Sequence, residues 1–232
     1  MKPFAPTSSL ALLPVLPDPA AMWLGAGIRP MVDGRDVLKE IHPEGDASCH
    51  RHRWFGPPET WPLWAGEEPR VVELSNNDCD SGCCGGVFVT IRRRGDVVEW
   101  SDWQNTSDMR VPVPPRVRFD AAEYDAELAR LVADDSWEEP VDTAARLLAQ
   151  WVAEFGWYER WACEPFANSI SIGSRGDAPA VGWGFMMGGF GPGGAYGRYT
   201  MPVSDQEDVP AQVRRFTDQI ADSDPRQTAK RL

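Results

Sequence analysis

The sequence predicts an α+β fold, with antiparallel hairpin-based sheets, a helix pair in the middle of the chain and a helix near the C-terminus. Residues 71–103 and 169–203 contain runs of alternating apolar and polar side chains, whereas residues 120–155 and 208–220 repeat apolar side chains at helical spacing. These segments are segregated along the chain, which favours α+β over a doubly wound fold. The 232 residues, 42% hydrophobic and 25% charged, suffice for one large domain or two small ones.

The strand segments include one predicted hairpin. Residues 87–94 and 96–103 are rich in β-branched and aromatic side chains, and Arg94-Gly95 between them suits a tight turn. A short strand over residues 71–74 precedes this hairpin. Further strand candidates in the last third of the chain are residues 169–172, 181–187 and 196–203.

Each predicted helix begins at a recognisable residue. Asp120 and Glu123 have the spacing of a capping box, which predicts a helix from residue 121 onward. Pro140 suits the first turn of a second helix, and Gly156 is a suitable C-cap for it. Asp208 is the expected N-cap of a third helix near the C-terminus.

The N-terminal part is harder to assign, because residues 1–69 hold 11 of the 21 prolines. We expect a proline-rich extended arm on the surface and a short helical turn over residues 36–41. Residues 53–64 are rich in proline and tryptophan, so we expect an irregular segment whose rings pack on a sheet. The predicted division is a β unit with hairpin and helix over 1–140 and a second unit over 141–232, or one continuous domain.

Charge and cysteine content limit the partners and the location of the protein. The net charge of −12 disfavours nucleic acid as a partner, since it would repel duplex DNA.

No apolar run reaches about 18 residues, so we expect no membrane span. The N-terminus imitates a secretory signal peptide, but Pro14 interrupts its apolar stretch. The five cysteines are odd in number, so a fully paired disulfide framework is excluded and a reduced, cytoplasmic protein is expected.

Negative charge is concentrated in residues 120–142, which contain nine acidic residues and one basic residue, Arg130. Such a stretch is commonly a solvated helix face. The alternative is a docking surface for a basic protein partner, because acidic patches speed encounter and select partners. The residues that we assign to partner binding are Glu123, Glu127, Asp134, Asp135, Trp137, Glu138 and Glu139.

Histidines and cysteines gather in residues 42–84, in the patterns CHRH (residues 49–52) and CDSGCC (residues 79–84). Zinc takes four nitrogen or sulfur ligands. A structural zinc would fix the irregular N-terminal segment, and its predicted ligands are Cys49, His52, Cys79 and Cys83. The C-x3-C spacing matches no standard zinc motif. Two alternatives stay open, namely small buried apolar residues and a thiol-redox pair at Cys83-Cys84.

Familiar catalytic motifs are absent, since the sequence has neither a G-x-S-x-G elbow nor an H-E-x-x-H pair. The glycine-rich residues 188–197 lack the Gly-Lys-Ser/Thr ending of a phosphate-binding loop, so they predict a hairpin loop. The 11 tryptophans suit core packing first and a glycan or aromatic ligand second. These absences favour a binding protein over an enzyme.

Two resemblances accompany these motifs. Cys79 and Cys83 precede the 87–103 hairpin, which ends in Trp100-Ser101-Asp102-Trp103. This Cys-rich turn followed by a Trp-Ser-Asp-aromatic hairpin resembles an uncharacterised family of high-GC bacteria, over about the first half of the chain, and implies no activity. The acidic surface and the α+β layout are similar, at the level of class, to bacterial immunity proteins that neutralise toxin domains.

The sequence therefore predicts a binding protein, of immunity or antitoxin type, that docks a basic protein partner through an acidic face. The alternative is a zinc-binding or thiol-redox protein that uses the residues between 42 and 84. No cofactor other than zinc is expected.

Overall fold

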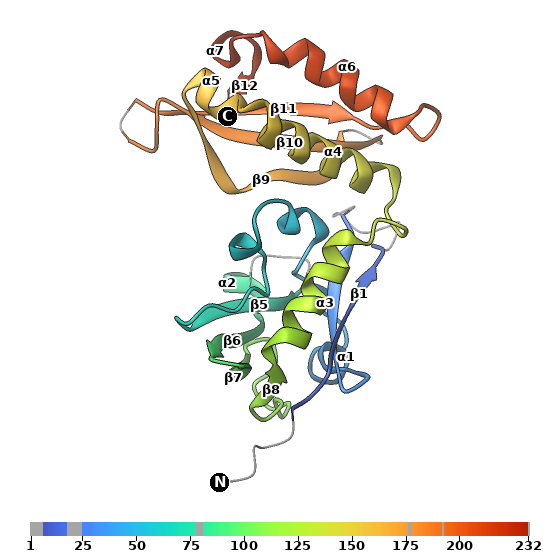
Figure 1. The fold of residues 1–232 in the computed structure, drawn as a ribbon, viewed down its shortest axis with the longest axis vertical. Coiled ribbons are helices and arrows are strands. Elements are labelled where there is room, and N and C mark those ends of the chain that lie inside the picture. The colour runs from blue at the N-terminus through green and yellow to red at the C-terminus, as the bar shows by residue number, and fades with distance from the viewer. Residues whose placement is uncertain (1–6, 18–24, 78–80, 176–177, 192, 232) are drawn as a thin grey trace. The chain divides into compact units, whose positions relative to one another are not determined.

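The computed structural model describes residues 7–17, 25–77, 81–175, 178–191 and 193–231. Its strands form antiparallel sheets and its longer helices are segregated from them along the chain, which confirms the predicted α+β class (Figure 1). Contacts divide the chain into two compact units. Unit 1 comprises Met1–Val15, Gly27–His50 and Pro57–Asp135, and unit 2 comprises Leu16–Ala26, Arg51–Gly56 and Ser136–Leu232.

The main sheet of unit 1 has the strand order β4-β5-β6-β7-β8. Its strands are β4 (Asp46–Ala47), β5 (Arg70–Asn76), β6 (Gly86–Arg94), β7 (Val97–Asn105) and β8 (Val117–Asp120). Arg94 pairs with Val97 across a tight turn, so the predicted hairpin is confirmed. Gly95 in that turn has a φ of 60°, a left-handed conformation that glycine adopts without strain.

Alternation along this hairpin directs one face of the sheet into the core of unit 1. The apolar residues at positions 87, 89 and 91 of β6 are fully buried, as is Trp100 on β7. The Trp100 ring packs edge-on against Phe119 at 5.3 Å and Tyr124 at 6.3 Å between ring centroids. The core of unit 1 is therefore built around a group of aromatic rings.

A second sheet of unit 1 contains the residues expected to be a surface arm. Strands β1 (Leu10–Val15), β2 (Gly27–Val32) and β3 (Arg35–Asp36) pair in that order. Leu10 lies opposite Val32, and Leu12 is fully buried, so residues 10–15 are a sheet strand and the expectation of an arm was wrong here. The helical turn expected over residues 36–41 is confirmed as α1 (Val37–Ile41), whose N-cap Asp36 accepts a hydrogen bond from the Lys39 amide.

Helix α3 (Ala121–Ala133) follows β8 directly. The carboxylate of its N-cap, Asp120, accepts hydrogen bonds from the amides of Ala122 and Glu123, as the capping pattern predicts. Tyr124 and Leu128 are buried on the inner side of the helix. Because these residues face the core, the acidic residues on the opposite side of α3 face outward.

Unit 2 is built on a sheet with the strand order β12-β11-β10-β9. Its elements are α4 (Pro140–Phe155), α5 (Trp157–Trp161), β9 (Cys163–Arg175), β10 (Ala178–Met187), β11 (Ala195–Pro202), α6 (Val209–Ala221), α7 (Pro225–Thr228) and β12 (Lys230–Arg231). The helices begun by Pro140 and Asp208 and the three predicted strand regions are confirmed. Gly156 ends α4 with a φ of 63°, and α5 follows it at once, a turn that the sequence did not predict.

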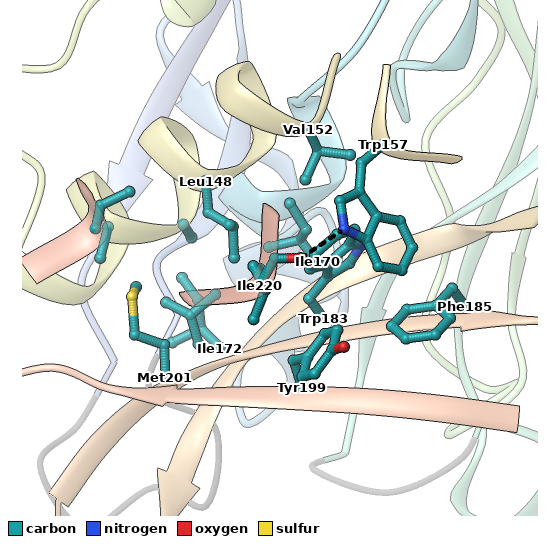
Figure 2. Packing of buried hydrophobic residues seen from close by; sticks show 14 of the residues in the cluster. Leu148, Val152, Trp157, Ile170, Ile172, Trp183, Phe185, Tyr199, Met201 and Ile220 are labelled. Carbon is teal, nitrogen blue, oxygen red and sulfur yellow. Dashed lines mark hydrogen bonds between the residues drawn. The ribbon is translucent and has the colours of Figure 1, made fainter. Parts of the chain in front are cut away.

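The core of unit 2 lies between the helices and one face of this sheet (Figure 2). Leu148 and Val152 of α4 pack on strand residues such as Ile172 and Trp183. The indole of Trp157 donates a hydrogen bond to the Ile220 carbonyl at 3.3 Å, which ties α5 to α6. The buried tryptophans here act as packing residues.

The tryptophan-rich segment 51–64 is divided between the units. Its first part forms the short 3-10 turn η1 (Arg51–Trp54) and belongs to unit 2, while the part after residue 57 belongs to unit 1. The sequence predicted a boundary between the two units after residue 140. In the structure, the chain passes from unit 1 to unit 2 for the last time between residues 135 and 136. Among the residues that the structure describes, none of the helices has the length and apolar character needed to cross a bilayer.

Candidate functional site

The outer side of α3 combines small and acidic side chains. Glu123 and Asp125 are exposed there. Exposed alanines lie beside them, at the helical spacing of 122, 126, 129 and 133. A partner can therefore approach the backbone of α3 closely and meet carboxylates at the same time.

Several acids of the stretch already have partners within unit 1. Asp125 pairs with Arg93. Glu127 accepts a hydrogen bond from the Leu12 amide and pairs with Arg130, so it is engaged in holding β1. Asp134 lies 3.6 Å from the Arg130 guanidinium. Of the predicted binding residues in unit 1, Glu123 and Asp135 are the exposed ones.

A hollow of about 500 Å³ lies beside α3, on the side of Asp125. It is lined by residues of the 58–67 segment, of β6 and of α3: Pro58, Trp61, Trp64, Ala65, Gly66, Glu67, Arg93, Asp125, Leu128 and Ala129. Trp61 and Trp64 are half-buried, which leaves part of each indole available to a ligand. Glu59, Glu67 and Glu68 of the same segment are exposed, so the surroundings of the hollow carry further negative charge.

The tryptophan segment is irregular, yet a single arginine holds its backbone. The Arg70 guanidinium donates hydrogen bonds to the carbonyls of Trp61, Pro62 and Trp64, at 2.9, 2.6 and 2.9 Å. Segments without regular secondary structure need such side-chain partners for their carbonyl groups. Arg70 therefore fixes the floor of the hollow from the first residue of β5.

Three further hydrogen bonds join this segment to β6 and α3. Arg93 donates from its backbone amide to the Gly66 carbonyl at 2.7 Å and from Nε to the Ala65 carbonyl at 3.0 Å. The Tyr124 hydroxyl donates to the Leu63 carbonyl at 2.6 Å. Burial raises the pKa of Tyr124 above its ordinary range, so the hydroxyl stays protonated and keeps this donor role.

The remaining predicted binding residues lie in unit 2, just before α4. Glu139 is exposed, whereas Trp137 is half-buried with its ring 5.7 Å from the Arg51 guanidinium carbon. The Glu138 carboxylate is 1% exposed and pairs with Arg51 at 3.5 Å and Arg146 at 2.9 Å. Glu138 is thus an interior ion-pair residue, and we do not include it in the exposed surface.

Asp142 is the second buried carboxylate of this group and is 0% exposed. Burial raises its pKa to about 6, and the nearby backbone groups of Ala26 and Glu139 oppose this rise. Arg51 also favours the charged form, while Glu138 opposes it. The group is enclosed within unit 2, which makes it a structural element of that unit.

The predicted zinc ligands lie in different surroundings. Cys49 is buried in unit 1 and its thiol donates to the Glu73 carbonyl at 3.6 Å, His52 belongs to unit 2, and Cys83 is exposed on α2 (Ser81–Cys84). Cys79 lies outside the described residues. In the part of the chain that is described, no three His, Cys, Asp or Glu side chains form a group that could hold a metal ion. The zinc and thiol-redox hypotheses stay predictions.

His42, the third histidine, is buried in unit 1 and bonded on both ring nitrogens. Nδ1 lies 2.9 Å from the Ser75 hydroxyl, and Nε2 lies 2.7 Å from the Asn77 amide oxygen. Because that oxygen can only accept, Nε2 carries the proton and Ser75 donates to Nδ1. Ser75 is 0% exposed, so this Ser-His-Asn series holds the end of β5 in place and is closed to a substrate.

The hollow itself was not predicted from the sequence. The available signal was the pair Trp61 and Trp64 in a proline-rich segment, and the missing information was which residues would hold that segment beside α3. Comparison with models of protein families, with curated proteins and with solved structures finds no match to this chain.

Proposed function

We propose that the protein is a binding protein that captures a basic segment of a protein partner on unit 1. The binding surface consists of the exposed acids of α3 and the adjacent hollow that Trp61 and Trp64 line, and we call it the α3 surface. The observation that carries the proposal is the position of this hollow beside an acidic helix.

The chemistry of the α3 surface suits arginine and lysine side chains. Carboxylates such as Glu123 and Glu67 attract the cation, and a guanidinium or ammonium group gains further from contact with an indole face. Partly buried tryptophans also make good anchors at protein interfaces, because they bury a large area at small entropic cost. The exposed alanines of α3 allow a partner backbone to approach.

An immunity or antitoxin protein that neutralises a basic toxin domain is the setting we favour. Its location would be the cytoplasm, which fits the free thiols of Cys83 and Cys163. Such proteins act by covering a partner and need no chemistry of their own, in keeping with the lack of a familiar catalytic motif in the sequence.

A fluorescent nona-arginine peptide tests the proposal by anisotropy titration against the full chain. We expect binding that weakens as salt is raised, since screening reduces attraction between exposed charges. Trp61→Ala should weaken binding by about fivefold or more, as truncation of an interface anchor does. The double reversal Glu67→Lys/Glu123→Lys should weaken it by about three- to tenfold.

The matched control is Asp205→Lys/Asp218→Lys, which changes the net charge equally at exposed positions of unit 2. If both double variants lose the same affinity, the peptide responds to net charge alone and the α3 surface is not the site. Unchanged binding by Trp61→Ala would remove the hollow from the proposal.

A further inference from the structure

The sheet of unit 2 has a second face, opposite the core shown in Figure 2. Tyr199 and Met201 of β11 point into the core, so the alternating residues Tyr196, Arg198 and Thr200 lie on the other face. On β10 the core residues Trp183 and Phe185 alternate with glycines at 182 and 184. The second face is therefore lined by glycine backbone beneath the side chains of β11.

These glycines allow two polar side chains to lie against the sheet. A Cβ atom on Gly182 would collide with the guanidinium of Arg198, and one on Gly184 would collide with the hydroxyl of Tyr196. Both glycines are buried although they carry no side chain, because Arg198 and Tyr196 cover them. The sequence thus places Arg198 in a defined position, with its planar group over Gly182.

Arg198 lies next to a second cation, and no acidic side chain that the structure describes pairs with it. Lys230 of β12 stands directly opposite it in the register, so the two side chains share this face. Neither side chain makes a hydrogen bond or ion pair with another residue in the described part of the chain. Other arginines of unit 2 are paired with carboxylates, namely Arg146, Arg160, Arg215 and Arg226. Two adjacent cations that pair with no described carboxylate, in a chain of net charge −12, fit an anionic ligand.

Aromatic rings lie next to this cation pair. Phe166 of β9 stacks on Tyr196 with ring centroids 5.1 Å apart, and Phe190 meets Phe166 edge-on at 5.6 Å. Phe190 belongs to the glycine-rich loop between β10 and β11 and is 64% exposed. Exposed aromatic side chains beside a flat sheet face are the usual platform for a nucleobase.

We propose that this face of unit 2 binds a nucleoside monophosphate, with the phosphate on Arg198 and Lys230 and the base against the Phe166, Phe190 and Tyr196 rings. Tyr196 and Arg198 are two residues apart on one strand, or about 7 Å. That spacing is comparable with the separation of base and phosphate within one nucleotide. The guanidinium of Arg198 can bind phosphate through two parallel hydrogen bonds.

The hydroxyl groups of the same face suit the sugar. Thr200 follows Arg198 on β11, and Ser171 of β9 is near β10, with its hydroxyl 3.5 Å from the Gly182 carbonyl. The glycine-rich loop has no role in gripping the phosphate here, because it lacks the sequence of a phosphate-binding loop and precedes a strand. The site shares no residue with the α3 surface, so either proposal can fail without the other.

Isothermal titration calorimetry of the full chain with AMP, and then with GMP, CMP and UMP, tests this inference. We expect at least one nucleotide to bind in about the micromolar-to-millimolar range. Inorganic phosphate and adenosine should each bind more weakly than AMP, because each occupies half of the site. Arg198→Gln should weaken nucleotide binding by about tenfold or more, and Lys230→Gln by about threefold.

Gly182→Ala is a more specific test than removal of a charge, because both cations are kept. The added methyl group displaces the Arg198 guanidinium, so this variant should also bind nucleotide more weakly. Arg214→Gln, an exposed position on α6, is the matched charge control and should bind as the unchanged chain does. Near-ultraviolet circular dichroism checks that each variant is folded. The inference is overturned if no monophosphate binds at millimolar concentration, if Arg198→Gln and Gly182→Ala bind normally, or if inorganic phosphate binds as tightly as the nucleotides.

Discussion

Asp142 shows how far a single residue can depart from its ordinary acid–base behaviour. Burial raises its pKa to about 6 from 3.8. The folded protein therefore holds this proton more tightly than the unfolded chain does, and its contribution to the free energy of unfolding falls as pH rises between those two values. The whole change corresponds to about 2–3 kcal/mol, and it is complete above about pH 6.

Asp142→Asn should remove this dependence. We expect the variant to unfold at higher urea concentration than the unchanged chain at pH 7, and the difference to shrink toward pH 4.5. Asp218→Asn, an exposed carboxylate on α6, is the control and should keep the pH profile of the unchanged chain. Identical profiles for the unchanged chain and Asp142→Asn would mean that Asp142 titrates as an ordinary carboxyl.

At the scale of elements, the acidic helix α3 holds a strand as well as presenting charge. The Leu12 amide of β1 donates to Glu127, and the Leu12 carbonyl accepts from Arg130 at 2.8 Å. Strand β1 is an edge strand of its sheet, and the amide and carbonyl of Leu12 both point away from β2. The helix therefore supplies both backbone partners that this position of the sheet lacks.

Glu127→Ala should loosen β1 by removing an acceptor from a partly buried amide, at a cost of about 1–2 kcal/mol. Hydrogen exchange followed by mass spectrometry should show faster exchange over residues 10–15, with β6 and β7 unchanged. Glu123→Ala on the exposed side of α3 is the matched control. Equal exchange over residues 10–15 in both variants would contradict this role of Glu127.

Elements governed by local signals could be predicted from the sequence. Asp120, Gly95 and Gly156 act on their immediate neighbours, so the 87–103 hairpin and the longer helices were expected where they are found. Strand β1 was missed, because its stability depends on Glu127 and on other residues far away in the sequence. The acidic character of α3 was predicted, whereas the hollow was not, because the Arg70 hydrogen bonds that shape it leave no local pattern.

At the scale of the whole molecule, the two units are interleaved along the chain. Residues 51–56 precede most of unit 1 in the sequence, yet they belong to unit 2. Arg51 brings its guanidinium, 1% exposed, to the Glu138 carboxylate at 3.5 Å, with the rings of Phe55 and Trp137 against it. Burial lowers the pKa of this guanidinium, and Glu138 opposes that effect.

Unit 2 should therefore depend on a residue that lies between β4 and β5 of the main sheet of unit 1 in the sequence. Arg51→Met keeps the apolar bulk but leaves Glu138 with less compensation, which should cost about 3 kcal/mol. The loss should appear in hydrogen exchange as faster exchange of α4 and β9, with β6 and β7 retaining their protection. The double variant Arg51→Met/Glu138→Gln removes both charges, so it should recover part of the lost stability. If the double variant is as unstable as the sum of the single ones, packing of the 51–56 segment, and not the ion pair, joins it to unit 2.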